Sequence, residues 1–328
     1  MKVLVTGASG FVGSHIVDSL RTRNIDTAVL LRPTSDKQFL SAQLPALEIR
    51  KGSITDPASL PAALAGITHV IHCAGCTRAR NNTEFDAVNH VGTRNLVEAV
   101  NANGGLVRFL HISSLAVSGP GTPERPARED DPPRPISDYG RSKAAGEQFV
   151  TQNCRAPFTV VRPPAVYGPR DYGFLSMFKA IQNHVLPRPK RSQSLSLVYA
   201  KDLAEVIVSC LEHPAAVGRT YFAAGRQSIT ARAMASEIAS QMNRWTAPLP
   251  MPGLLLWPIC LAQECFARLT GRPTLLNLQK YAELRAPGWV CDSSRLLNET
   301  GLACNTPVKQ GIAETLKWYR QESWLPKA

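Results

Sequence analysis

A tyrosine and a lysine four positions apart, Tyr139 and Lys143, have the types and spacing that point most directly to chemistry. They open a predicted helix, and a spacing of four places both side chains on one helix face, one turn apart. A phenol has an ordinary pKa of about 10, so its use as a base near neutral pH requires a fall of about 3 in that pKa. The ammonium of Lys143, helped by a second positive charge, could supply this fall. The pair therefore predicts a proton-transfer site.

A glycine-rich turn directly follows the first predicted strand. It reads Thr6-Gly7-Ala8-Ser9-Gly10-Phe11-Val12-Gly13 and opens an amphipathic helix. Gly7 permits a tight turn, Gly10 lets the backbone approach a pyrophosphate, and Gly13 lets helix and strand pack closely. Amides of the first helical turn, beginning at Phe11 and Val12, would then hold the phosphates. Because the glycines stand between a strand and a helix, they predict dinucleotide binding rather than a merely structural turn.

The end of the second predicted strand, Thr27–Leu31, lacks the carboxylate that would bind an adenosine ribose. Arg32 follows it, with Ser35 and Lys37 nearby, and could neutralise a 2′-phosphate. This favours NADP(H) as the cofactor. The alternative is that Arg32 only stacks on adenine, in which case NAD(H) would bind as well.

The elements that must position these residues alternate between strand and helix in the first half of the chain. Strands are predicted at Val3–Thr6, Thr27–Leu31, Leu47–Lys51, His69–His72, Val107–Ile112 and Thr159–Arg162. Continuous runs of Val, Ile and Leu are typical of parallel strands that are buried on both faces. We therefore predict an α/β fold, with a Rossmann doubly wound parallel sheet and a smaller, mostly C-terminal substrate-binding lobe.

The alternation loosens in the second half of the chain, which suggests that the chain passes between two lobes. We predict that residues 1–165 form the dinucleotide-binding domain and that 195–225 return to it. Residues 166–194 and 226–328 would form the substrate-binding lobe. The proline-rich stretch Pro120–Pro135 is too long for an ordinary connection, which indicates a lid or a binding loop.

The net charge and its distribution narrow the classes of partner. A formal net charge of +12 raises the question of nucleic acid or an anionic membrane. The basic residues are scattered, however, and the densest cluster, Arg188, Lys190 and Arg191, has no interleaved aromatic residues for base stacking. We expect a small-molecule substrate and no nucleic acid.

The cysteines and the apolar runs bear on compartment and metal binding. Eight irregularly spaced cysteines are not typical of a secreted disulfide framework. Cys73 and Cys76 could form a redox or zinc pair, but no second such pair accompanies them, so inert thiols are favoured and no metal is expected. The first strand begins too early for a cleavable signal, and the longest apolar run, Gly253–Ala262, is too short to span a bilayer. These features predict a cytoplasmic protein without a transmembrane segment.

Two motifs and several shorter segments resemble the extended short-chain dehydrogenase/reductase family, also called the NAD-dependent epimerase/dehydratase superfamily. The motifs are TGASGFVG at residues 6–13 and YGRSK at residues 139–143. The shorter matches are residues 72–75, 89–93, 111–114, 161–170 and 198–203. Ser113-Ser114-Leu115-Ala116 is most similar to the branch of 3β-hydroxysteroid dehydrogenases and dihydroflavonol reductase-like enzymes.

The resemblance implies roles for individual residues. Tyr139 would be the acid/base and Ser114 the hydroxyl that polarises the substrate oxygen. Lys143 would lower the pKa of Tyr139 and bind the nicotinamide ribose. Ser113 could replace Ser114, but the family's spacing between serine and tyrosine matches Ser114.

The resemblance also implies further contacts with the cofactor. Ala74 and Gly75 would lie beside the cofactor ribose, and Pro163 and Val166 would lie against the nicotinamide carboxamide. After the third strand the family often has Gly-Asp, whose acid reaches adenine, whereas this chain has Gly52-Ser53-Ile54. Ser53 could still form a hydrogen bond there, beside Ile54, so adenine binding would be altered rather than lost.

Reductases, epimerases and dehydratases share the same three catalytic residues, so substrate contacts must distinguish the reaction. Enzymes for nucleotide sugars commonly carry an arginine where this chain has Leu195, which cannot pair with an anion, although Arg170 or Arg188 could compensate. Dehydratases usually have acidic residues after their serine or threonine. Leu115 and Ala116 stand at this place and argue against dehydration.

These features together predict an NAD(P)-dependent oxidoreductase that interconverts a secondary alcohol and a ketone on a lipophilic, steroid-like substrate. The apolar segment Pro252–Cys260 could line its pocket, make a peripheral membrane contact, or simply pack inside the lobe. The alternatives are an NAD-dependent sugar epimerase and a non-catalytic NADP-sensing regulator. Because relatives often pair two long helices across an interface, a homodimer is expected.

Overall fold

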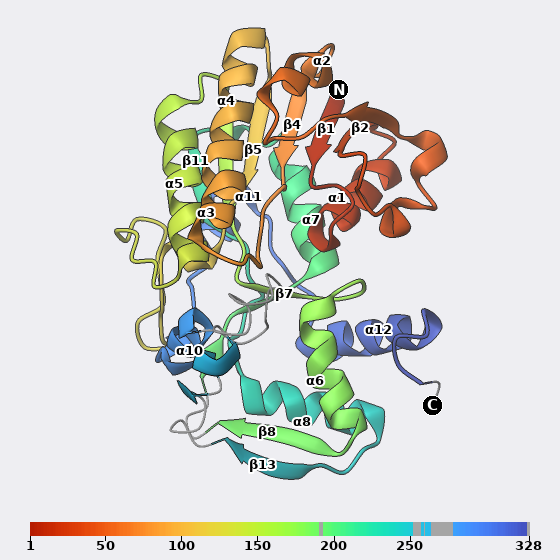
Figure 1. Cartoon of the computed structure of the whole chain (residues 1–328), viewed down its shortest axis with the longest axis vertical. Coiled ribbons are helices and arrows are strands. Elements are labelled where there is room, and N and C mark those ends of the chain that lie inside the picture. Colours follow the sequence, from red (N-terminus) through yellow and green to blue (C-terminus); the bar gives the residue numbers. More distant parts are fainter. Residues whose placement is uncertain (190–192, 252–256, 259, 264–277, 327–328) are drawn as a thin grey trace.

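Seven parallel strands form the central sheet of the computed structural model (Figure 1). The structure describes all residues except 190–192, 252–256, 259, 264–277 and 327–328. The strands are β1 (Lys2–Thr6), β2 (Asp26–Leu31), β3 (Glu48–Lys51), β4 (His69–His72), β5 (Arg108–Ile112), β6 (Phe158–Arg162) and β11 (Arg219–Phe222). Their order is β11-β6-β5-β4-β1-β2-β3, and every neighbouring pair is parallel. The predicted Rossmann sheet is confirmed.

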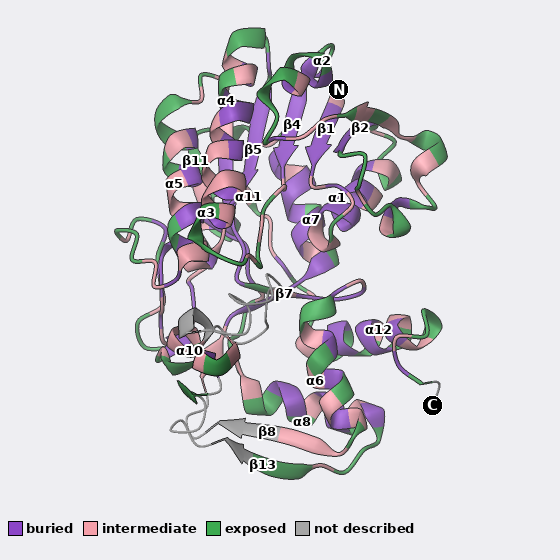
Figure 2. Ribbon diagram, viewed as in Figure 1, coloured by how far each residue is buried: buried purple, intermediate pink, exposed green. Residues whose placement is uncertain are grey.

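Helices cover both faces of this sheet. Helices α1 (Phe11–Thr22) and α7 (Ala200–Cys210) lie on one face, and α2 (Leu60–Leu64), α4 (Gly92–Asn103) and α5 (Asp138–Asn153) lie on the other. Alternation along a strand divides its side chains between the faces. In β1, Val3 and Val5 pack with α1 and α7, whereas Leu4 packs with α2 and α4. The inner strands β1, β4 and β5 are therefore buried on both sides, as Figure 2 shows, whereas the edge strand β3 is partly exposed.

A second group of elements lies beyond the carboxyl ends of the strands (Figure 1). Its helices are α6 (Tyr172–Gln182), α8 (Ala231–Met242), α10 (Leu278–Arg285) and α12 (Val308–Gln321). Its short strands pair as β7 (Ala165–Tyr167) with β10 (Leu197–Tyr199), as β8 (Val185–Pro189) with β13 (Ala247–Met251), and as β9 (Ser194–Leu195) with both β12 (Ile229–Thr230) and β14 (Gly288–Trp289). Phe178, Ile238 and Leu316 belong to a core of its own.

The chain returns from this lobe to the sheet more than once. Helix α7 packs on α1, and β11 adds a strand to the edge of the sheet. The helix α11 (Ser294–Thr300) also packs against β11, and its Leu296 joins the core beneath α1. The domain limits at 165, 195 and 225 stay a prediction.

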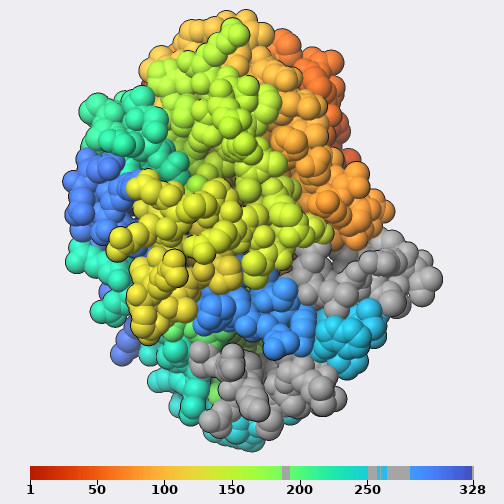
Figure 3. Space-filling view, turned by 90° about the vertical axis from the view of Figure 1, so that its left-hand side faces the viewer, coloured from red at the N-terminus to blue at the C-terminus, as the bar shows by residue number. Residues whose placement is uncertain are grey.

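The proline-rich stretch is anchored to the C-terminal region. The amides of Val290 and Asp292 donate to the carbonyl oxygens of Gly121 and Ala127, at 3.1 and 2.9 Å. In Figure 3 this stretch (yellow) lies against the blue residues near 290. Backbone pairing of this kind argues against a freely opening lid.

Within the described residues, no helix is long and apolar enough to cross a bilayer. Most of the apolar segment from Pro252 to Cys260, the side chain of Arg188, and residues 190–192 lie outside the part that the structure describes.

Candidate active site

The sheet has a switch point between β1 and β4. From there the strand order runs outward through β2 on one side and through β5 on the other, which opens a crevice at the carboxyl ends of the strands. The turns after β1 and β4 meet in this crevice. Gly7 has φ +69°, and a Cβ there would stand 2.6 Å from the amide nitrogen of Ala74. Only glycine fits this crossing of two backbones.

The glycine turn forms a cradle at the start of α1. The amide of Gly10 donates to the carbonyl oxygen of Gly7 at 3.1 Å, and a Cβ on Gly13 would overlap that same oxygen. The first amides of a helix, here those of Phe11 and Val12, have no intrahelical acceptor, and α1 has no acidic residue in its first turn to repel an anion. The cradle therefore fits the pyrophosphate of a dinucleotide.

Helix α5 brings the predicted proton-transfer residues together. Ser137 caps the helix by accepting from the amide of Gly140 at 3.2 Å, so Tyr139 and Lys143 lie in its first two turns. The ammonium of Lys143, only 4% exposed, donates to the carbonyl oxygen of Ile112 at 2.6 Å. The side chain of Ser114 lies close enough to Tyr139 to favour a lower pKa of its phenol. The three predicted residues thus form one cluster, where β5 ends and α5 begins.

Burial shifts the pKa values of both titratable groups. It lowers the pKa of Lys143 to about 8, against the opposing influence of Cys73 and Glu147, so the ammonium form persists at neutral pH. It raises the pKa of Tyr139, and the nearby side chain of Ser114 only partly opposes this rise. The protein by itself therefore keeps Tyr139 protonated, which suits a group that donates a proton.

The two adjacent serines face different partners. Ser113 is 4% exposed and its hydroxyl donates to the carboxylate of Glu147 at 2.5 Å. Ser114 is half-buried, lies near Tyr139, and accepts from the amide of Ala116 at 3.1 Å. Only Ser114 lies where it could meet a substrate oxygen held by Tyr139.

The residues expected near the nicotinamide half surround this cluster. Gly75 lies in the turn after β4, and a Cβ there would stand 3.9 Å from the ammonium nitrogen of Lys143. Pro163 follows β6, and its carbonyl oxygen accepts from the amide of Leu115 at 2.9 Å. Val166 is half-buried in β7. The loops after β4, β5 and β6 therefore border the same crevice.

The residues expected near the adenine half lie at the other side of the crevice. Arg32 is exposed after β2, and its amide donates to the hydroxyl of Ser35 at 3.0 Å. Burial raises the pKa of Cys76, and the hydrogen bond with the carbonyl oxygen of Arg78 and the charge of Arg32 oppose this rise. Ser53 is half-buried, whereas Ile54 is buried and packs below α4.

The paired thiols in the crevice show no sign of reactivity. Burial raises the pKa of Cys73 to about 11, so its thiol stays protonated at neutral pH. Burial likewise raises the pKa of Cys76. In the described part of the chain, no three His, Cys, Asp or Glu side chains form a group that could hold a metal ion.

Three residues that surround this cluster were given no role by the sequence: Asn89, Glu147 and Arg162. Asn89 donates to the hydroxyl of Ser142 at 3.0 Å and accepts from the amide of Cys76 at 2.8 Å, which ties α5 to the turn after β4. Glu147 and Arg162 form a buried ion pair beneath the serines. A spacing of four after Lys143 is the sequence signal that could have found Glu147.

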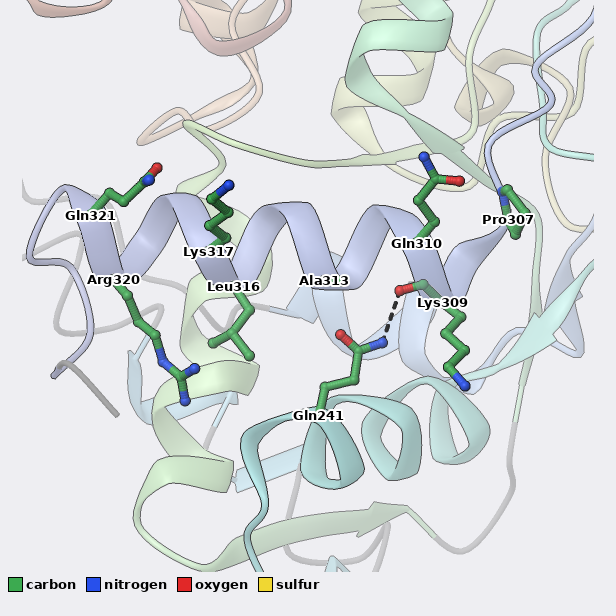
Figure 4. Close-up of a pocket in the computed structure, with 9 residues that line it drawn as sticks. All are labelled: Gln241, Pro307, Lys309, Gln310, Ala313, Leu316, Lys317, Arg320 and Gln321. Atoms are coloured by element: carbon green, nitrogen blue, oxygen red, sulfur yellow. Dashed lines mark hydrogen bonds between the residues drawn. The ribbon is translucent and has the colours of Figure 1, made fainter.

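A groove of about 830 Å³ lies between α8 and α12, apart from this crevice (Figure 4). The amide of Gln241 on α8 donates to the carbonyl oxygen of Lys309 at 2.8 Å across its floor. Lys309, Lys317 and Arg320 of α12 supply its charges. None of the residues predicted for catalysis or cofactor binding lines this groove.

Comparison with known proteins gave matches over most of the chain. The model of the NAD dependent epimerase/dehydratase family matches residues 3–224. The ceramide reductase of Caulobacter vibrioides is 30% identical over 328 residues, covering 99% of this chain and 96% of that protein. The UDP-glucose 4-epimerase of Vibrio cholerae is 28% identical over 292 residues, covering 84% of each.

Among solved structures, the UDP-glucose 4-epimerase of Thermus thermophilus in complex with NAD has the same fold. It matches with a TM-score of 0.77 at 23% identity, covering 98% of this chain and 99% of that one.

Proposed function

The chain belongs to the NAD dependent epimerase/dehydratase family of short-chain dehydrogenases/reductases, enzymes that act on CH–OH groups, and from this premise we propose that it interconverts a secondary alcohol and a ketone. The membership confirms the resemblance predicted from the motifs. The observation that carries the proposal is the proximity of Ser114 and Tyr139 to each other beside the buried ammonium of Lys143, which donates to the carbonyl oxygen of Ile112.

Each residue of the cluster has a defined task in this proposal. A bound nicotinamide dinucleotide supplies or accepts the hydride. In the direction of reduction, Ser114 donates a hydrogen bond to the ketone oxygen and Tyr139 gives it a proton. The raised pKa of Tyr139 suits this direction, because the phenol is protonated at neutral pH. In the reverse direction the charge of Lys143 favours the phenolate.

Support for a lipophilic substrate comes from the lobe and from one relative. Leu195 lies in β9 and packs against the core of the lobe, so it offers no positive charge to a diphosphate. The ceramide reductase is similar over nearly the whole chain, and its name specifies a lipid substrate. The experiment is to follow NADPH and NADH absorbance with a panel of long-chain, steroid and aliphatic ketones and nucleotide sugars. We expect consumption of NADPH with the lipophilic ketones.

A sugar epimerase is the second candidate, because the similarity to the UDP-glucose 4-epimerase of Vibrio cholerae covers most of the chain. An epimerase oxidises and re-reduces its substrate within one turnover. Cofactor retained through purification, together with UDP-glucose converted to UDP-galactose without a net absorbance change, would favour this candidate.

Replacing Arg32 with alanine tests the preference for the phosphorylated cofactor. A charge-assisted hydrogen bond is worth about 1.5–3 kcal/mol, so we expect the KM for NADPH to rise by about tenfold to a hundredfold. The KM for NADH should stay within about twofold, since it has no 2′-phosphate. Steady-state kinetics with both cofactors measure this, with Arg23→Ala as an exposed arginine control. Equal losses with both cofactors would show that Arg32 does not read the 2′-phosphate.

We further propose that the enzyme acts in the cytoplasm as a homodimer on a small molecule and does not bind nucleic acid. The family's habit of pairing two long helices supports the dimer. Light scattering of the purified chain measures its mass in solution, and a monomeric mass at micromolar concentration would contradict the dimer.

A further inference from the structure

A buried ion pair lies directly beneath the two serines. The guanidinium of Arg162 on β6 donates to the carboxylate of Glu147 on α5, at 2.5 Å from Nη2 to Oε1 and 3.0 Å from Nε to Oε2. Their side chains are 6% and 7% exposed. The same carboxylate accepts from the hydroxyl of Ser113 at 2.5 Å. One acidic side chain thus joins α5, β6 and the end of β5.

The Nη1 group of Arg162 has partners of its own. Its Nη1 donates to the hydroxyl of Ser118 at 3.2 Å and to the carbonyl oxygen of Glu129 at 3.3 Å. Its guanidinium also lies over the ring of Phe222, 5.8 Å from the centroid. Buried ion pairs are often no more stable than apolar side chains of similar volume, so stability alone does not account for this network.

We propose that Glu147 is a positioning residue for the reaction: it fixes the turn of Ser113 and Ser114 and holds a negative charge one helix turn from Lys143. This inference rests on the proposed function of the cluster. Neighbouring side chains in an extended segment point to opposite sides. A carboxylate that holds the hydroxyl of Ser113 inward therefore directs Ser114 outward, toward Tyr139.

The charge of Glu147 is distinctive among the groups around Lys143. His72 on β4 and His111 on β5 lie near enough to Lys143 for its charge to act on them. Burial lowers the pKa of His72 to about 3 and that of His111 well below its usual range, so both are neutral. The thiol of Cys73, with its pKa raised to about 11, is neutral as well. Glu147, which is paired with Arg162, is therefore the described carboxylate that favours the ammonium form of Lys143.

The test is the double substitution Glu147→Gln with Arg162→Met, which removes both charges and leaves neither unpaired. Without the carboxylate, Lys143 loses its proton at lower pH, and the phenolate of Tyr139 is less stabilised. For alcohol oxidation, we expect the pH below which kcat/KM falls (the acid limb of the pH profile) to rise by at least about half a unit. We also expect kcat at neutral pH to fall by about tenfold. Ser113→Ala keeps the ion pair, so it should lower kcat and leave the acid limb in place.

The matched control is Thr159→Val, which removes a fully buried hydroxyl that donates to the carbonyl oxygen of Ala216 at 2.6 Å. It should reduce thermal stability without changing the pH profile. A folded double variant with the wild-type pH limb would overturn the inference. If the double variant does not fold, the Ser113→Ala variant decides the positioning role of Glu147. A wild-type kcat in that variant overturns the role, and a lowered kcat at unchanged KM supports it. A wild-type enzyme without turnover would instead refute the proposed function.

Discussion

Replacing Tyr139 with phenylalanine is expected to lower kcat for ketone reduction by at least about a thousandfold, because it removes the proton donor. The substitution keeps the aromatic ring, whose centroid lies 6.1 Å from that of Phe85, and deletes only the hydroxyl. The cradle at the start of α1 is untouched, so the Kd for NADPH should stay within about twofold. Steady-state kinetics and a fluorescence titration of NADPH measure the two quantities.

The matched control for this substitution is Tyr172→Phe. Tyr172 is 54% exposed and stacks on Trp324 at 4.2 Å, with no contact to the cluster. Its variant should keep wild-type turnover. Retained turnover in the Tyr139 variant would refute the assignment of Tyr139 as the acid/base.

Replacing Gly13 with alanine is expected to weaken NADPH binding by at least about a hundredfold. The added Cβ would overlap the carbonyl oxygen of Gly7 and stand 2.7 Å from its carbonyl carbon and 2.9 Å from the Cα of Ala8. These are backbone atoms, so the turn itself must open and the phosphate cradle is lost. Overpacking of this kind costs about 1–3 kcal/mol of stability. A titration of NADPH and a thermal melt measure the two effects.

A control variant must show that weaker NADPH binding in Gly13→Ala comes from the distorted glycine turn and not from a general loss of stability. Gly218 has φ +70° with open space around its missing Cβ, so Gly218→Ala should destabilise the protein by about 1–2 kcal/mol through backbone strain alone. This control should bind NADPH as the wild type does. Wild-type affinity in the Gly13 variant would contradict the placement of the cofactor at this turn.

Much of the sheet could be predicted because most of its strands are short segments whose own residues are typical of buried strands. Val3 to Val5 and His69 to His72 form short runs that helices bury from both sides. β11 was not predicted, since Arg219 is exposed, Thr220 is half-buried, and the strand is defined by its pairing with β6. The two-residue strands β12 and β14 likewise depend on β9, a partner distant in the chain.

The candidate site divides in the same way. The spacing of Tyr139 and Lys143 and the glycine turn are local, so sequence alone suggests them. The different surroundings of Ser113 and Ser114 are not local. They depend on Glu147 of α5, which forms an ion pair with Arg162 of β6. This ion pair forms only once α5 has packed on the sheet.

The central claim is net oxidoreduction at a lipophilic carbonyl, and a single-turnover reaction with deuterated cofactor tests it most directly. NADPH carrying deuterium on the transferable position of its nicotinamide ring is mixed with excess enzyme and a long-chain ketone, and the products are examined by mass spectrometry. We predict one deuterium on the carbinol carbon of the alcohol and one oxidised cofactor per alcohol formed. Cofactor that remains reduced with every lipophilic ketone, while UDP-glucose is epimerised without a net change in cofactor absorbance, would contradict it.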